Sequence, residues 1–175
     1  MRTFPRVFVS VGSNIDPEAN VVRGLRLLDA EVGVRSVSTF YRTPALNRPQ
    51  DPPFANGVIE LGDALGPLEM KTLLQRVERT LGREHSSNRY APRTLDLDLL
   101  LHGDQVLSSN ALTLPHPDIR DRAFVAIPLL EIAPDLVLPD SGMTLRSIVD
   151  SLPPYPMDPL RDLTRRLREE VGHGS

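Results

Sequence analysis

The sequence predicts an α+β fold with an antiparallel sheet and helices packed on its faces. Strand-like and helix-like segments are intermixed without the regular alternation that a parallel sheet requires. Two segments repeat apolar residues at helical spacing, and a third alternates leucine with aspartate as a strand does. The 175 residues are enough to bury a sizeable core, so we expect a single domain, 1–175.

A strand and a helix are expected at the start of the chain. The apolar run 7–11 predicts the strand, which is closed by the Gly-Ser-Asn sequence at 12–14. Asp16 and Pro17 follow as the N-cap and the first residue of a helix, and Gly33 is a residue type that commonly ends one. The apolar residues of this helix recur at helical spacing: Val21, Leu25, Leu28 and Val32.

The next stretch predicts two strands, a loop and a second helix. Residues 34–43 are rich in β-branched and aromatic side chains, and residues 58–61 form a second strand-like run. Residues 44–53 must be a loop, because four prolines interrupt both kinds of regular structure. The helix opens at Pro67 and ends at Gly82. Its apolar stripe consists of Met70, Leu73, Leu74, Val77 and Leu81.

A basic loop and an acidic strand come next. The apolar pattern disappears over 83–93, where basic residues dominate, and we expect part of this loop to close over a bound nucleotide. Residues 94–101 predict a strand with the leucines at 95, 97, 99 and 101 on one face and Asp96 and Asp98 on the other. Further helices are expected over 123–132, kinked near Pro128, and over 145–152, with Thr144 as the cap.

Composition excludes several classes of protein and site. With no cysteine, the chain has no disulfide, thiolate metal site or cysteine nucleophile, and this fits a reducing compartment. The net charge of −3 argues against a general nucleic-acid binder. No run approaches the roughly 18 apolar residues of a membrane helix, so we expect a cytoplasmic protein that binds neither nucleic acid nor membrane.

The pair Asp96 and Asp98 is the sharpest local signal of chemistry. Alternate residues on one strand face lie about 7 Å apart, so both carboxylates can reach one divalent ion or a pair of ions. The competing interpretation is an ordinary solvated strand face. The arginines just upstream favour function, because a divalent metal with arginines is how proteins handle a nucleoside triphosphate. No P-loop sequence is present.

Other residues carry weaker signals. The Gly-Ser-Asn sequence at 12–14 is either an anion site before a helix or an ordinary tight turn. His116 lies between two prolines in a loop near Arg122, where a histidine is either exposed or functional. Phe54 and Phe124 are either core residues or stacking partners for a flat ligand.

These motifs together carry a resemblance to a known family. The stretch 89–100, with the sequence RYAPRTLDLDLL, is similar to the signature of the 6-hydroxymethyl-7,8-dihydropterin pyrophosphokinases. Further matches occur in order along the chain, so that the similarity runs from about 7 to 152. They are Gly12-Ser13-Asn14, Phe40-Tyr41-Arg42-Thr43-Pro44, Phe54 with Asn56, Glu78 with Gly82-Arg83, Pro115-His116, and Arg122 with Phe124 and Pro128-Leu129.

The resemblance implies a ferredoxin-like fold with helices on both faces of the sheet. It implies transfer of the β,γ-diphosphate of ATP to the hydroxymethyl group of the pterin, with release of AMP, in folate biosynthesis. Two Mg²⁺ ions would be held by Asp96 and Asp98, and Arg83 and Arg93 would join these acids as catalytic residues. The pterin would be bound by Thr43, Leu46, Phe54, Asn56 and Phe124. ATP would be bound by Gln75, Arg83, His85, Tyr90, Arg93, Thr113, His116 and Arg122.

The chain departs from the family pattern at several positions. Tyr90 stands where some members have Trp, and His85 and Ala111 stand where some have Arg. Residues 155–175 have no counterpart in the pattern, and a helical stripe among arginines predicts a helix docked on the surface or frayed. The chain is expected to be a monomer or a homodimer.

Two other functions remain open from the residues alone. A metal-dependent nuclease also uses paired acids on a strand, but it usually needs a further acid or lysine nearby, and the single lysine, Lys71, lies on a predicted helix. A ferredoxin-like module that binds a small molecule without catalysis explains an aromatic pocket. It does not explain Asp96 and Asp98 beside arginines.

Overall fold

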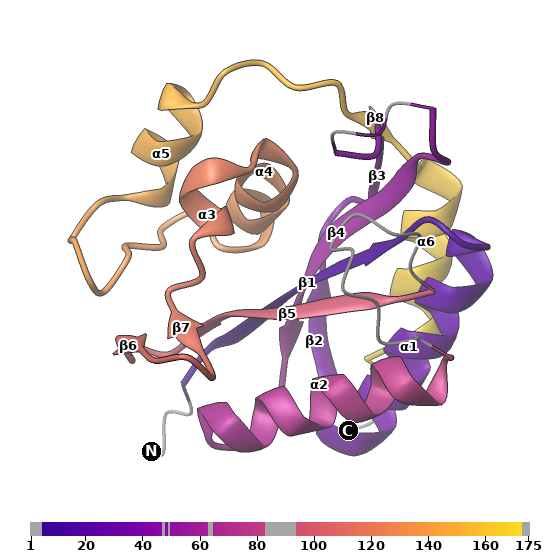
Figure 1. Ribbon diagram of the computed structural model, residues 1–175, viewed down its shortest axis with the longest axis horizontal. Helices are drawn as coiled ribbons and strands as arrows, with labels where there is room; N and C mark the ends of the chain where they lie inside the picture. Colours follow the sequence, from indigo (N-terminus) through magenta and orange to yellow (C-terminus); the bar gives the residue numbers. More distant parts are fainter. Residues whose placement is uncertain (1–4, 47, 49, 63–64, 83–93, 173–175) are drawn as a thin grey trace.

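The protein is built on one mostly antiparallel sheet with helices on both faces, as the sequence predicts (Figure 1). The computed structural model describes residues 5–46, 48, 50–62, 65–82 and 94–172. The strands of the sheet are β1 (Val7–Ser13), β2 (Val34–Val37), β3 (Tyr41–Thr43), β4 (Phe54–Leu61), β5 (Asp96–His102) and β8 (Asp158–Pro159). They follow the order β5-β1-β4-β3-β8, and β2 pairs with the other half of the β4 edge that β3 occupies. A separate hairpin consists of β6 (Leu107–Ser108) and β7 (Thr113–Leu114).

The helices divide between the two faces of the sheet (Figure 1). One face carries α1 (Pro17–Val32), α2 (Pro67–Thr80) and α6 (Arg161–Glu170), and the other carries α3 (Asp118–Asp121), α4 (Ala123–Ile132) and α5 (Leu145–Ser151). The predicted stripes of α1 and α2 are buried in the first of the two apolar clusters. The second cluster lies between the sheet and α4 and includes Phe8, Val58 and Val125.

The expected helix ends are found with one difference. Thr144 caps α5 by accepting the Ser147 N–H at 3.2 Å, and Gly33 after α1 has a φ of 78° that favours glycine. Asp16, however, makes no side-chain cap. Instead its carbonyl accepts the Asn20 N–H at 3.0 Å, and Pro17 occupies the first helical turn.

The predicted strand 34–43 is wrong as a single strand. It is interrupted at Ser38, whose buried hydroxyl accepts the Val58 N–H at 2.9 Å in place of a strand carbonyl. The Phe40 carbonyl accepts a hydrogen bond from Leu160 at 2.7 Å, so this part of the chain pairs with the C-terminal segment. The strand expected over 58–61 in fact starts at Phe54, because tertiary pairing extends it through an Asn-Gly sequence that locally indicates a turn.

The predicted alternation of β5 holds for Asp96 to Leu99 and then fails. Leu97 and Leu99 face the first cluster, as expected, but Leu100 and Leu101 both lie in the second. The register with β1 shifts here: Phe8 is opposite Leu101, and Val9 is opposite Leu99. One extra residue in β5 therefore turns Leu101 to the opposite face from the one predicted.

The C-terminal helix is docked, not frayed. Leu163 and Leu167 of α6 and the following Val171 are buried in the first cluster, where α6 contacts α1 and β2. In the described part of the chain, no helix is both long and apolar enough to cross a membrane.

Candidate active site

The polar residues of three neighbouring strands form one row at an end of the sheet. Gly12 of β1 lies opposite Asn56 of β4 on one side and opposite Asp96 of β5 on the other. Ser10, two residues earlier, lies opposite Asp98. These residues lie on the sheet face that α4 covers. They are not part of the apolar cluster under α4, and a pocket opens over them.

A first pocket, of about 160 Å³, opens over this row. Gly12 and Asn56 belong to its floor, Asp96 and Asp98 lie on one side, and the start of α4 is on the other. All five residues predicted to bind the pterin line this pocket: Thr43, Leu46, Phe54, Asn56 and Phe124. The structure therefore brings together residues as far apart in the chain as Thr43 and Phe124, and their binding role stays a prediction.

The side-chain amide of Asn56 is held in one orientation. Its Nδ2 donates to Oγ1 of the buried Thr43 at 2.7 Å. The amide oxygen faces Gly12, where an added Cβ would lie only 2.7 Å from it. The glycine is therefore required for close approach. Gly12 and Ser13 belong to β1, so the Gly-Ser-Asn sequence at 12–14 is the end of a strand at the pocket and not a simple turn, and its role as an anion site stays a prediction. The neighbouring Ser13 joins the end of β1 to the residues before β5, because its hydroxyl donates to the Thr94 carbonyl at 2.6 Å.

The phenylalanines separate into core and pocket. Phe40 is fully buried in the first cluster. Phe54 and Phe124 are half-buried and reach the first pocket from β4 and from α4. Aromatic rings that are half-buried at a pocket are better placed to stack on a flat ligand than to fill the core.

A second, larger pocket of about 750 Å³ runs along β5, which is an edge strand in the described part of the sheet. It is lined by α2 on one side and by the segment from β7 into α3 on the other. Four of the residues predicted to bind ATP lie there: Gln75, Thr113, His116 and Arg122. Arg83, His85, Tyr90 and Arg93, with the loop expected to close over the nucleotide, lie outside the described residues.

Glu78 joins α2 to the acidic strand. Its side chain is buried, and Oε2 accepts the N–H of Leu97 at 2.8 Å. Leu97 lies between Asp96 and Asp98, so this hydrogen bond fixes the edge strand at the acidic pair and satisfies a backbone N–H that has no further strand beside it in the described sheet. Gln75, three residues earlier and exposed, lines the same pocket.

The loop that carries His116 is fixed by its own backbone. The N–H of His116 donates to the Leu100 carbonyl at 2.9 Å, and the N–H of Asp118 donates to His116 Nδ1 at 3.0 Å. Because Nδ1 accepts a hydrogen bond, the neutral ring carries its proton on Nε2. Arg120 donates to Asp140 at 2.7 Å, and this hydrogen bond lowers the pKa of the Asp140 carboxyl. Of the two arginines in this loop, Arg122 is the one that lines the pockets.

The two pockets meet at a small set of charged residues. Asp96, Asp98, Asp118 and Arg122 line both of them. Asp118 was missed by the sequence analysis, because the four-residue helix α3 that presents it has no periodicity to detect. Lys71 was missed as well: it lines the second pocket, and its Nζ contacts the carbonyl of Ala111. The signal was available, since Lys71 precedes Gln75 by one helical turn.

The donor set at the junction fits a hard divalent cation. Asp96 and Asp98 are half-buried carboxylates on one face of a strand. Within the described residues, no group of three or more His, Cys, Asp or Glu side chains is arranged to hold a metal ion. Mg²⁺ is typically bound by one or two carboxylates, with waters and substrate phosphates as the other ligands, so two acids are sufficient.

Two pockets that join at paired carboxylates and an arginine define a class, an enzyme that transfers a phosphorus-containing group between two substrates. The family model described as 7,8-dihydro-6-hydroxymethylpterin-pyrophosphokinase (HPPK) matches residues 8–134. The chain belongs to this family.

Curated relatives with the name 2-amino-4-hydroxy-6-hydroxymethyldihydropteridine pyrophosphokinase support the assignment. One from Synechocystis is 39% identical over 147 residues, which cover 82% of this chain and 74% of the relative. One from Pseudomonas aeruginosa is 39% identical over 151 residues, which cover 85% and 92%. One from Haemophilus influenzae is 36% identical over 137 residues, which cover 77% and 85%.

Solved structures confirm the fold. A Plasmodium falciparum HPPK-DHPS structure with pterin and p-hydroxybenzoate matches with a TM-score of 0.67 at 12% identity, covering 86% of this chain and 43% of that one. A triple mutant of the same protein with pteroate matches with a TM-score of 0.65, also at 12% identity, over 85% of this chain and 43% of that one. This chain thus spans less than half of those longer chains, and the likeness establishes the expected ferredoxin-like α+β fold.

Proposed function

We propose that this protein transfers the β,γ-diphosphate of ATP to the hydroxymethyl oxygen of 6-hydroxymethyl-7,8-dihydropterin and releases AMP. The observation that carries the proposal is the junction of the two pockets at Asp96 and Asp98. The first pocket has two half-buried aromatic rings, Phe54 and Phe124, that suit a flat pterin, and the second has the size and the cations that suit ATP.

The reaction requires the attacking oxygen and the leaving oxygen to lie in line with the β-phosphorus. The hydroxymethyl oxygen attacks the β-phosphorus, a new O–P bond forms, and the bond from that phosphorus to the α–β bridging oxygen breaks. The hydroxyl proton is released, and AMP leaves with the bridging oxygen. Because the pockets meet at the acids, a pterin held by Asn56 and Phe124 presents its hydroxymethyl group to the ATP side.

The junction of the pockets contains both a positively charged side chain and negatively charged side chains. Arg122 lines both pockets and balances negative charge on the diphosphate, and the Nε2–H of His116 is available to donate to a phosphate oxygen. Asp96 and Asp98 would hold two Mg²⁺ ions. When bound, these ions neutralise the triphosphate and align it with the attacking oxygen.

Composition supports a proposal for the cellular setting. The absence of cysteine supports the cytoplasm, and the net charge of −3 supports small-molecule substrates over nucleic acid. We propose a monomer or homodimer that acts there.

The proposed activity is tested by incubating the protein with ATP, Mg²⁺ and the reduced hydroxymethylpterin. We expect AMP to appear only when all three are present, in a 1:1 ratio with the pterin diphosphate, because each transfer releases one AMP. Formation of ADP, or turnover of ATP without pterin, would contradict the proposal. Cleavage of DNA or RNA under the same conditions would support a nuclease, and pterin binding without AMP would support a binding module.

Replacement of Phe124 by Ala tests the pterin pocket. The ring reaches the pocket half-buried, so we expect pterin binding to weaken by about 0.5 to 1.5 kcal/mol from lost stacking, and by a similar amount from lost apolar contact. ATP affinity should hardly change. The two affinities are measured by titration calorimetry, with thermal unfolding as the control. A loss of roughly 3 to 5 kcal/mol in stability with unchanged pterin affinity would mean that Phe124 is a core residue.

A further inference from the structure

The C-terminal segment 155–170 lies outside the matched part of the family model, 8–134, yet it reaches the walls of the first pocket. It crosses from α5 over the end of the sheet and returns along α1 as the helix α6 (Figure 1). It contacts the pocket walls directly through Tyr155, and it binds the segments next to these walls through Thr164 and Arg168.

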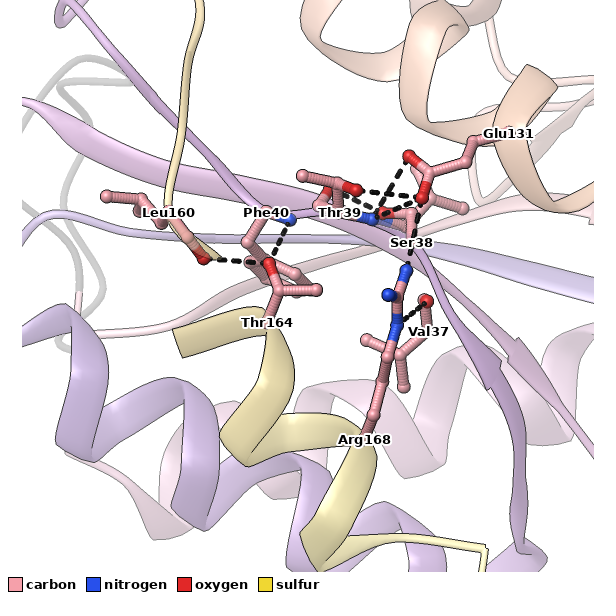
Figure 2. A network of polar contacts seen from close by, with 9 residues as sticks. Val37, Ser38, Thr39, Phe40, Glu131, Leu160, Thr164 and Arg168 are labelled. Carbon is pink, nitrogen blue, oxygen red and sulfur yellow. Dashed lines mark hydrogen bonds and ion pairs between the residues drawn. The ribbon is translucent and has the colours of Figure 1, made fainter. Parts of the chain in front are cut away.

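Thr164 anchors the helix to the segment that leads into β3. This side chain is 4% exposed, and its Oγ1 accepts the N–H of Phe40 at 2.9 Å while donating to the Leu160 carbonyl at 2.8 Å. The N–H of Leu160 in turn donates to the Phe40 carbonyl at 2.7 Å. Figure 2 shows the Thr164 hydroxyl between the Phe40 nitrogen and the Leu160 carbonyl. Both polar groups of the Phe40 backbone are thus bound by the C-terminal segment. Thr43, three residues further on, is a wall of the pocket.

Arg168 ties the same segment to α4. Its Nε donates to the Val37 carbonyl at 3.0 Å, and its Nη2 donates to Glu131 Oε1 at 3.1 Å. Glu131 also accepts the backbone N–H of Thr39 at 3.0 Å and its hydroxyl at 2.8 Å (Figure 2). One arginine of α6 thus joins residues 37–39 to the last turn of α4, and Phe124 lies in the first turn of the same helix.

Tyr155 backs the pocket directly. Its ring lies 5.7 Å from the Phe124 ring, centre to centre, at an interplanar angle of 52°. Its hydroxyl donates to the Pro44 carbonyl at 3.4 Å, and Pro44 and Phe124 both line the pocket. Burial raises the pKa of Tyr155, and the nearby positive charge of Arg122 opposes the shift. Beyond Tyr155, Asp158 and Pro159 extend the sheet by pairing with β3.

We propose that the segment 155–170 is a positioning element for the pterin pocket, which holds β3 and the start of α4 at the separation that a flat ring needs. The proposal rests on the proposed function. None of the residues of this segment lines either pocket, so it acts on the substrate through Phe124, Pro44 and Thr43. A rigid support of this kind improves affinity, because the pocket walls then lose less conformational entropy when the ring binds.

Two arginines of α6 provide a matched test. Arg168 is 49% exposed and joins α6 to residues 37–39 and α4, whereas Arg166 is 46% exposed and pairs with Glu18 of α1 at 3.1 Å, away from the pocket. We expect Arg168→Ala to weaken binding of 6-hydroxymethyl-7,8-dihydropterin by roughly 3- to 10-fold, as for the loss of one or two hydrogen bonds. The KM for ATP should stay at the wild-type value. Arg166→Ala should leave both values unchanged and serves as the control for a general loss of helix docking.

Tyr155 gives a second, independent variant. Tyr155→Ala should weaken pterin binding by roughly 3- to 10-fold, because it removes the ring behind Phe124. Tyr155→Phe retains that ring and should stay close to wild type, since the hydroxyl contact with Pro44 is long.

Binding is measured by calorimetry with the reduced pterin in the presence of a non-hydrolysable ATP analogue and Mg²⁺, and unfolding temperatures are recorded for all variants. A wild-type protein that binds no pterin overturns the proposed function itself, before any variant is compared. If the wild type binds, the positioning role requires a pterin-specific loss in both Arg168→Ala and Tyr155→Ala. Wild-type pterin affinity in either variant, or an equal loss in Arg166→Ala, overturns it.

Discussion

Asp98→Asn and Asp96→Asn are each expected to lower turnover by at least ~100-fold, in line with about 2.7 kcal/mol or more for a lost transition-state contact. Both carboxylates lie where the two pockets meet, so we expect each to act on the group in transfer. An amide of the same shape keeps the fold but removes the charge that would hold Mg²⁺. The amount of Mg²⁺ needed for half-maximal activity should rise in both variants.

The measurement is kcat by AMP release over a range of Mg²⁺ concentrations, with thermal unfolding recorded alongside. Asp104→Asn is the matched control, because Asp104 is an exposed acid in the turn just after β5 and lines neither pocket. Near-wild-type turnover in Asp96→Asn or Asp98→Asn would remove the reason to place the metal at this strand.

Gly12→Ala is expected to raise the KM for the pterin strongly, on the order of 100-fold, as for a misplacement of about 1 Å in a site. The new Cβ would lie 2.7 Å from the Asn56 amide oxygen and 3.7 Å from Phe54. The amide must turn away, and its hydrogen bond to Thr43 is then lost or bent. The clash involves the far end of a side chain at a hollow in the sheet, so the unfolding temperature should change little.

A double-mutant cycle with Asn56→Ala separates a steric effect from a general distortion. Asn56→Ala alone should also weaken pterin binding, because it removes the oriented amide. In that background Gly12→Ala should cost much less than in the wild type, because the atom it collides with is gone. Additive losses in the double variant, or an equal rise in the KM for ATP, would show that Gly12→Ala distorts the strand instead.

Features that depend only on residues close together in the chain were predicted correctly. The stripes of α1 and α2, the Thr144 cap and the alternation of Asp96 and Asp98 are all read from local spacing, and the structure confirms each. The family resemblance supplied pocket residues such as Thr43 and Asn56, which no local pattern would select.

Features that depend on pairing between distant segments were predicted poorly. The break at Ser38 occurs because the Phe40 backbone pairs with Leu160 and Thr164 from the far end of the chain. Leu101 faces the opposite way because one extra residue is accommodated against β1, and a strand of leucines gives no sign of which residue is extra.

The residue types that can do the chemistry were evident without the structure: two acids on one strand face, close in sequence to a run of basic residues. The side-chain period of a strand is known without its partners. The family was evident as well, from motifs spread along the chain. Three features became visible in the three-dimensional fold alone: Gly12 lies between Asn56 and Asp96, Asp118 and Arg122 lie at the junction of the pockets, and Tyr155 packs against Phe124. Each of these is set by strand register or by the docking of α6, and both depend on which surfaces the whole chain buries together.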